Sequence, residues 1–96
     1  MTDDDAVVVR IPSALADLAG GRSLTFTPAP GDVAELLDVI ADERPALSRR
    51  IRDETGALRR FVNVYVDGDD VRHLAGTATP LRPGSEVHVL PSVAGG

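Results

Sequence analysis

The chain has 96 residues, of which 43% are hydrophobic, and a formal net charge of −5. This length suffices for one small domain with a single core and is too short for two. The acidic balance argues against nucleic acid and anionic membranes as partners. Cysteine and lysine are absent, which excludes disulfides, thiolate metal sites, a cysteine nucleophile and a lysine Schiff base.

The amino-terminal residues are acidic, where a secretory signal peptide would be basic. Met1–Asp5 therefore predicts a disordered leader with no function of its own. No apolar run is long enough to span a bilayer, and we expect a cytoplasmic protein with one domain over residues 1–92.

Four segments alternate apolar and polar residues with the period of two that is typical of strands: 6–12, 22–27, 61–66 and 85–90. The residues expected to face the core are Val7, Val9, Ile11, Leu24, Phe26, Val62, Val64, Val66, Val87 and Val89. Turns are predicted at Gly20-Gly21, Asp67-Gly68 and Pro83-Gly84. Between the last two strands, residues 69–76 predict a short strand or an irregular segment.

One amphipathic helix is predicted, from about Asp32 to Glu43. Asp32 and Glu35 have the spacing of a capping box, in which each side chain accepts a hydrogen bond from the backbone N–H of the other residue. The apolar residues recur with helical spacing and form one stripe: Val33, Leu36, Leu37, Ile40 and Ala41. Pro45 ends this helix, because a proline disfavours the helical conformation in the residue before it.

A short second helical turn is predicted after Pro45, because Leu47 and Ile51 are four residues apart. Its arginines are Arg49, Arg50 and Arg52. They are expected to point outward, either into solvent or toward an acidic docking surface on a partner. A single main helix that covers one face of one mixed sheet gives a two-layer α+β domain.

The other face of the sheet is predicted to carry four apolar or aromatic residues: Val8, Phe61, Tyr65 and Leu90. This set is too apolar for a face left to water, and we interpret it as a docking surface for a partner protein. The alternative is that these are scattered exposed residues, which are normal on any protein.

The histidines and acidic residues do not predict a metal site. His73 and His88 are fifteen residues apart, with no cysteine and no evident third ligand. The acidic segment with Asp67, Asp69 and Asp70 differs from a calcium loop, because its glycine is at the wrong position and no downstream glutamate has the right spacing. We interpret this segment as a charged turn.

The last six residues, from Pro91 to Gly96, differ from the rest of the chain because they are small and end in two glycines. We expect residues 93–96 to form a flexible tail that follows the domain. Such a tail, formed by Val93, Ala94, Gly95 and Gly96, is narrow enough to thread into the active site of a partner. The alternative is a frayed terminus without a function.

Three segments together resemble the prokaryotic sulfur-carrier family: Arg60–Val66 (RFVNVYV), Asp70–Arg72 (DVR) and the Val-Ala-Gly-Gly ending. That family includes the thiamine-pathway carrier, the small subunit of molybdopterin synthase and the carrier of a cysteine-biosynthesis route. The resemblance implies the β-grasp fold of ubiquitin, with a mixed sheet of four or five strands packed on one main helix. It covers nearly the whole chain.

The resemblance also implies that the protein is a carrier and not an enzyme. An adenylating (E1-like) enzyme would consume ATP to activate the Gly96 carboxylate, and a sulfur donor would displace AMP to leave a thiocarboxylate. The carrier itself would bind no cofactor. The ending and the central strand most resemble the cysteine-pathway branch, whose further partners are a pyridoxal-phosphate-dependent cysteine synthase and a zinc-dependent peptidase that releases cysteine.

Three alternatives stay open. A small subunit of molybdopterin synthase would form a lasting complex with a larger catalytic subunit. A ubiquitin-like protein modifier would be conjugated through Gly96 to lysines of other proteins. A plain interaction domain with an incidental tail would work equally well without its two terminal glycines.

Overall fold

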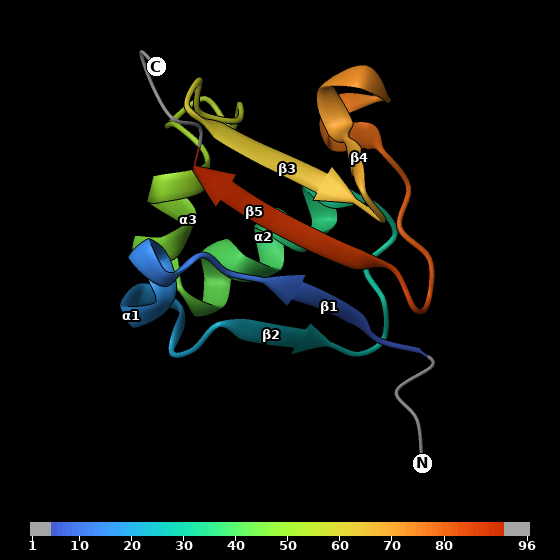
Figure 1. Ribbon diagram of the computed structural model, residues 1–96, viewed down its shortest axis with the longest axis horizontal. Coiled ribbons are helices and arrows are strands. Elements are labelled where there is room, and N and C mark those ends of the chain that lie inside the picture. Colours follow the sequence, from blue (N-terminus) through green and yellow to red (C-terminus); the bar gives the residue numbers. More distant parts are fainter. Residues whose placement is uncertain (1–4, 92–96) are drawn as a thin grey trace.

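The computed structural model describes residues 5–91, which form a sheet with helices packed against one face (Figure 1). The predicted tail and all of the predicted leader except Asp5 lie outside the described residues. The helices are η1 (Ser13–Leu15), α1 (Ala16–Ala19), α2 (Val33–Glu43), α3 (Pro45–Ile51), η2 (Val71–His73) and η3 (Gly76–Ala78). The strands are β1 (Val7–Arg10), β2 (Ser23–Phe26), β3 (Val62–Val66), β4 (Asp69–Asp70) and β5 (Glu86–Pro91).

The five strands form one mixed sheet in the order β2-β1-β5-β3-β4. β1 and β5, the first and last strands of the chain, lie side by side and are parallel, whereas the other neighbouring strands are antiparallel (Figure 1). The register places Val87 opposite Val9, and Val89 opposite Val64, so the predicted inward-facing valines share one face. The predicted two-layer α+β arrangement is confirmed.

The core lies between this face and the helices α2 and α3. Helix α2 buries Val33, Leu36, Leu37 and Ile40, whereas Ala41, the fifth residue of the predicted stripe, is only partly buried. Burial of each large aliphatic side chain contributes about 1.5–3 kcal/mol relative to exposure. The aliphatic residues of the strands and helices therefore supply most of the stability, as the low aromatic content requires.

Helix α2 begins with a cap that differs from the predicted capping box on one side. Asp32 Oδ1 accepts a hydrogen bond from the Glu35 backbone N–H at 2.8 Å, as expected. The Glu35 carboxylate, however, accepts from the N–H of Gly31 at 3.1 Å and not from that of Asp32. The first turn is thus satisfied by the predicted pair of acidic residues, with the return bond shifted by one residue.

Pro45 separates the two main helices, as predicted. Arg44 before it is not helical, with φ −142° and ψ 72°, and Pro45 itself occupies the first turn of α3, where its missing N–H costs nothing. Leu47 and Ile51 are fully buried, which confirms the second helical segment. The prediction for Arg52 was wrong: its side chain is only 15% exposed, because it turns back to α2 and pairs with Asp38 at 3.0 Å.

The turn at Asp67-Gly68 joins β3 to the short β4. Both residues have positive φ, 50° and 93° respectively, which is the conformation of a tight two-residue hairpin turn. This confirms the predicted turn and the short strand after it. The chain then passes through η2 and η3 before it enters β5.

Candidate functional site

Strand β5 carries the chain to the predicted tail and ends one residue later than expected. The sequence predicts its end at Leu90, because proline has no N–H for the strand ladder. In the structure Pro91 continues the strand and lies opposite Val62 of β3. The sheet therefore holds the residue immediately before Ser92, the first residue beyond the described part of the chain.

The topology explains why a proline is tolerated there. The Glu86 carbonyl accepts a hydrogen bond from the Asp67 N–H, on the β3 side of β5, at 2.9 Å. Backbone groups point alternately to the two sides along a strand, so those of Pro91, five residues after Glu86, face the β1 side. Pairing between β1 and β5 stops where Arg10 lies opposite His88. The missing N–H of Pro91 therefore falls beyond the end of β1 and leaves no ladder bond unmade.

The predicted tail residues, Val93, Ala94, Gly95 and Gly96, lie outside the described residues. What the structure places is the point from which they start, at the end of β5 beside α3 and the segment that leads into β3 (Figure 1). Their predicted role in threading into a partner stays a prediction.

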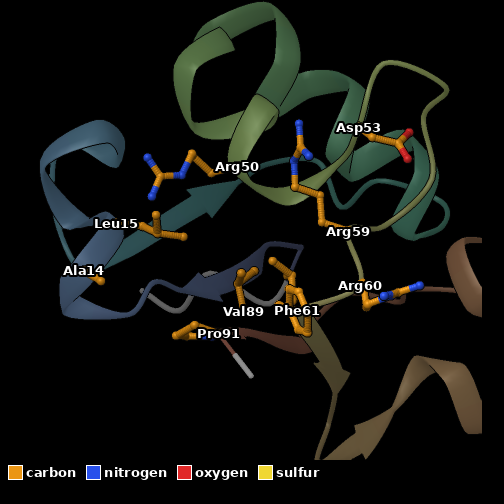
Figure 2. A pocket seen from close by; sticks show the side chains of 10 residues that line it. Ala14, Leu15, Arg50, Asp53, Arg59, Arg60, Phe61, Val89 and Pro91 are labelled. Atoms are coloured by element: carbon orange, nitrogen blue, oxygen red, sulfur yellow. The ribbon is translucent and has the colours of Figure 1, made fainter. Parts of the chain in front are cut away.

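A hollow of about 530 Å³ lies beside this point, and we call it the tail-base hollow (Figure 2). It is lined by Ala14, Leu15, Arg50, Asp53, Arg59, Arg60, Phe61, Val62, Val89 and Pro91. These residues come from four segments of the chain, 14–15, 50–53, 59–62 and 89–91. The apolar side chains of Leu15, Val89 and Pro91 lie together on one side, and three arginines contribute to its walls.

The structure does not gather the four predicted docking residues into one patch. Val8 and Tyr65 are partly buried and are separated by β5, because Val8 lies opposite Glu86 and Tyr65 lies opposite His88. Leu90 is 42% exposed and is paired with Asn63, so it is a diagonal neighbour of Tyr65.

Phe61 does not share the face of Tyr65. Arg60 and Phe61 form a turn before β3 begins at Val62, so the strand alternation does not yet apply to Phe61. Phe61, which is 48% exposed, lines the tail-base hollow together with Val89 (Figure 2). The docking role of the four residues stays a prediction, but it concerns two separate surfaces.

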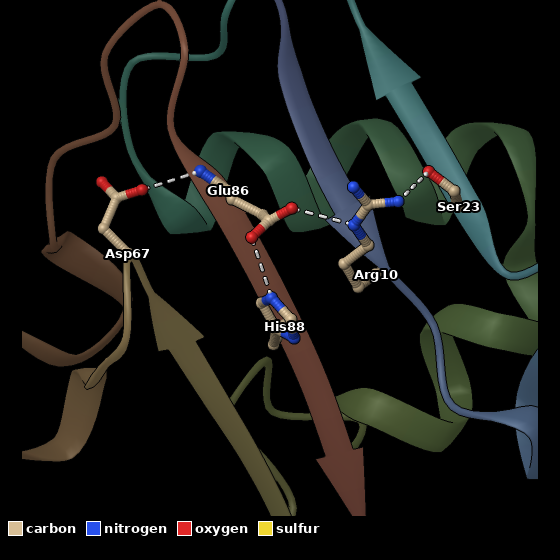
Figure 3. A network of polar contacts seen from close by, with 5 residues as sticks. All are labelled: Arg10, Ser23, Asp67, Glu86 and His88. Carbon is tan, nitrogen blue, oxygen red and sulfur yellow. Dashed lines mark hydrogen bonds and ion pairs between the residues drawn. The ribbon is translucent and has the colours of Figure 1, made fainter.

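Between Val8 and Tyr65, the outer face of the sheet carries a polar network (Figure 3). The Glu86 carboxylate accepts a hydrogen bond from Arg10 Nε at 2.9 Å and lies 3.1 Å from His88 Nε2. Arg10 also reaches Ser23 Oγ at 3.4 Å, and the Glu86 N–H donates to Asp67 Oδ1 at 2.9 Å. The hydrogen bond with His88, and then that with Arg10, lowers the pKa of Glu86 below its usual range.

No group of three metal-binding side chains occurs within residues 5–91. In the same part of the chain, every helix is too short or too polar to cross a membrane.

Comparison with known proteins gives concordant results. Residues 9–96 match the ThiS family. The sulfur carrier protein CysO of Mycobacterium tuberculosis is 38% identical over 93 residues, which cover 94% of this chain and 98% of CysO. The chain belongs to the ThiS family.

Solved structures agree with this assignment. A chain in the crystal structure of the Amycolatopsis orientalis BexX/CysO complex superposes with a TM-score of 0.82 at 34% identity, covering 94% of this chain and 99% of that one. The small archaeal modifier protein 1 of Methanosarcina acetivorans superposes with a TM-score of 0.79 at 31% identity, covering 95% and 96%.

Membership in the ThiS family confirms the predicted ubiquitin-like β-grasp fold and the predicted relationship to sulfur carriers. The protein is a carrier and not an enzyme. Two features of this ThiS family member were not predicted from the sequence, namely the tail-base hollow and the network around Glu86. The alternation of β5 placed Glu86 and His88 on the outer face, but only the register between β1 and β5 shows that Arg10 lies beside them.

Proposed function

We propose that this protein carries sulfur as a thiocarboxylate on Gly96. The observation that carries the proposal is the place of Pro91, which is held in the sheet at one end of the folded body and is followed by five residues. Five extended residues span roughly 17 Å at about 3.3 Å each, which is enough for Gly96 to enter a buried site on another protein. The 38% sequence identity to CysO, which is named a sulfur carrier protein, supports the same proposal.

The proposed charging reaction takes two steps. A Gly96 carboxylate oxygen attacks the α-phosphorus of ATP and displaces pyrophosphate, which gives an acyl-adenylate. A sulfur donor then attacks the acyl carbon, and AMP leaves with the former carboxylate oxygen. The activating enzyme holds ATP, and the carrier contributes the terminus. The chain has no thiol and no lysine amine of its own that could compete for the activated terminus.

The pathway that we propose is cysteine biosynthesis, because the CysO relatives cover nearly the whole chain. On a pyridoxal-phosphate-dependent cysteine synthase, the thiocarboxylate sulfur would add to an aminoacrylate made from an activated serine. Migration of the acyl group from sulfur to nitrogen would leave cysteine in amide linkage to Gly96, and hydrolysis of that amide by a zinc-dependent peptidase would release cysteine. Charging would take place in the cytoplasm. The small subunit of molybdopterin synthase remains an alternative, and a lasting complex with a larger subunit would favour it.

A second candidate function is conjugation to other proteins through Gly96. The similarity to the small archaeal modifier protein 1 of Methanosarcina acetivorans favours it. A ladder of high-mass conjugates in cells, lost when Gly96 is deleted, would support this function over the carrier function.

Intact-protein mass spectrometry tests the carrier function. The protein is incubated with ATP, sulfide and candidate adenylating enzymes, and we expect the exchange of one oxygen for sulfur at the carboxyl terminus. Deletion of Gly96 should abolish this exchange and leave the free energy of unfolding within about 0.5 kcal/mol of the unaltered protein. If the shortened protein still gains sulfur, Gly96 is not the charged residue.

A further inference from the structure

The tail-base hollow is positively charged, although the chain as a whole is acidic. Three arginines, Arg50, Arg59 and Arg60, line it against a single acidic residue, Asp53, whereas the net charge of the chain is −5. Arginine is well suited to bind an acidic side chain, because its planar guanidinium can form two parallel hydrogen bonds to one carboxylate.

The single acidic residue is already engaged by its own loop. The Asp53 carboxylate accepts hydrogen bonds from the backbone N–H groups of Thr55 at 2.8 Å and Ala57 at 3.2 Å, and from the Thr55 hydroxyl. Within residues 5–91, Arg50 and Arg60 form no ion pair with any acidic side chain. Their charges are therefore available to a partner.

The segment that carries two of these arginines is fixed in place. The Arg59 N–H donates to the Ile51 carbonyl at 2.9 Å, and its Nε donates to the Arg49 carbonyl at 2.6 Å. Arg72 Nη2 donates to the Arg59 carbonyl at 3.0 Å, and its Nη1 donates to Asn63 Oδ1 at 2.9 Å. A surface that is ordered before binding loses less conformational entropy when a partner arrives.

The hollow also offers an apolar contact between the charges. Leu15 and Val89 belong to the core and are exposed only slightly at its floor, whereas Phe61 stands at its edge with 48% of its surface exposed (Figure 2). An aromatic side chain beside arginines is the composition of residues that dominate binding at protein interfaces.

We propose that the tail-base hollow binds an acidic segment with one central apolar side chain, located on the enzyme that receives the tail. The inference rests on the proposed function for the identity of this partner. Pro91 lines the hollow, so an enzyme that takes up residues 92–96 has to approach this end of the protein. Acidic side chains of the enzyme would pair with Arg50 and Arg60, and its apolar side chain would contact Phe61.

A protein segment fits this surface better than nucleic acid does. A nucleic acid strand would extend past the hollow over a chain whose net charge is −5, whereas a short acidic segment meets a site where three arginines outnumber one acidic residue. The charges would mainly accelerate encounter and fix orientation, and the contact with Phe61 would slow dissociation.

The first test maps the surface without any enzyme. The full chain, labelled with ¹⁵N, is titrated with a synthetic peptide, acetyl-Asp-Glu-Leu-Glu-Asp-amide, and amide shifts are followed by NMR. We expect shifts centred on residues 14–15, 50, 59–61 and 89–90, and much smaller shifts with the matched peptide that has asparagine and glutamine. Shifts elsewhere, or none, would overturn the proposal, and so would shifts only with a single-stranded oligonucleotide.

The second test uses the adenylating enzyme that charges the unaltered protein. Arg60→Glu should raise the KM of that enzyme for the carrier by roughly 5-fold, and Arg50→Glu combined with Arg60→Glu by more than about 10-fold. The matched control is Arg82→Glu, an exposed site that does not line the hollow, which should stay within about 2-fold.

The two tests separate this inference from the proposed function. If no enzyme charges the unaltered protein, the carrier function fails, and the peptide titration still decides whether the hollow binds acidic segments. If the protein is charged and Arg60→Glu behaves like Arg82→Glu, the docking proposal fails and the carrier function stands. Circular dichroism confirms that the variants are folded.

Discussion

Pro91 lies opposite Val62 at the last paired position between β5 and β3. Val62 is 8% exposed and belongs to the core, so this pairing ties the base of the tail to a strand residue that packs in the hydrophobic core. The residues beyond Pro91 therefore start from a fixed point. A partner that recognises the folded body can use this fixed point to locate the terminus.

Leu90 is the first place to test recognition through the outer face. It is 42% exposed and lines a shallow depression with Arg10, Pro12 and His88. Leu90→Asp should weaken binding to the activating enzyme by about 2 kcal/mol, roughly 30-fold in Kd, because apolar burial is lost and a charge is desolvated. Titration calorimetry measures this change.

The control for Leu90→Asp is Leu74→Asp. Leu74 is 49% exposed and lies in the segment between η2 and η3, next to β4 and away from the end of β5 (Figure 1). Equal affinity of the two variants for the enzyme would show that Leu90 is not part of the docking surface.

Leu36 of α2 is expected to contribute strongly to the stability of the fold, because it is one of the largest fully buried side chains. Its side chain is 1% exposed between the helices and the sheet. Leu36→Ala should lower the free energy of unfolding by about 2–5 kcal/mol, the range typical of this substitution in a core, because a cavity remains. Leu90→Ala removes the same atoms from an exposed site and should cost less than about 1 kcal/mol in urea denaturation. Similar losses in both variants would contradict the assigned core.

Asp32 is expected to stabilise the start of α2. Its side chain caps the helix by accepting from Glu35 N–H at 2.8 Å. Asp32→Ala should lower the free energy of unfolding by about 1 kcal/mol. Asp42 is a matched control in the last turn of the same helix, where a negative charge is unfavourable, so Asp42→Ala should be neutral or slightly stabilising. Thermal unfolding of both variants decides the matter.

Local patterns predicted most of the fold because they depend on neighbours in the sequence. The alternation in β3 placed Val62, Val64 and Val66 in the core, and the helical spacing of α2 identified four of its buried residues. Family resemblance then supplied the topology, which alternation cannot determine. The errors fall where an element ends: Phe61 precedes the strand to which it was assigned, and Pro91 continues one that it was expected to end.

The surfaces were less predictable because their residues come together only in the folded chain. Arg52 was expected to point into solvent, but Asp38, fourteen residues earlier on α2, turns it inward. The tail-base hollow needs the segments at Leu15, Arg50, Phe61 and Pro91 to meet at one end of the sheet. No spacing in the sequence encodes that meeting.

The network around Glu86 makes the stability of the sheet depend on pH. Because His88 and Arg10 lower the pKa of Glu86 in the folded state, its ionised form favours folding. This contribution is present above the unfolded-state pKa of about 4.3 and is lost as the pH falls through the lower folded-state pKa. The loss of stability below about pH 4 should therefore be smaller in Glu86→Gln than in the unaltered protein.

Urea denaturation between about pH 2 and pH 7 measures this difference. Glu54→Gln is the matched control, because within residues 5–91 the side chain of Glu54 makes no hydrogen bond or ion pair. At neutral pH, Glu86→Gln should be the less stable of the two variants, since it loses the ion pair with Arg10. Parallel pH profiles for Glu86→Gln and the unaltered protein would mean that Glu86 is not held in its ionised form by Arg10 and His88.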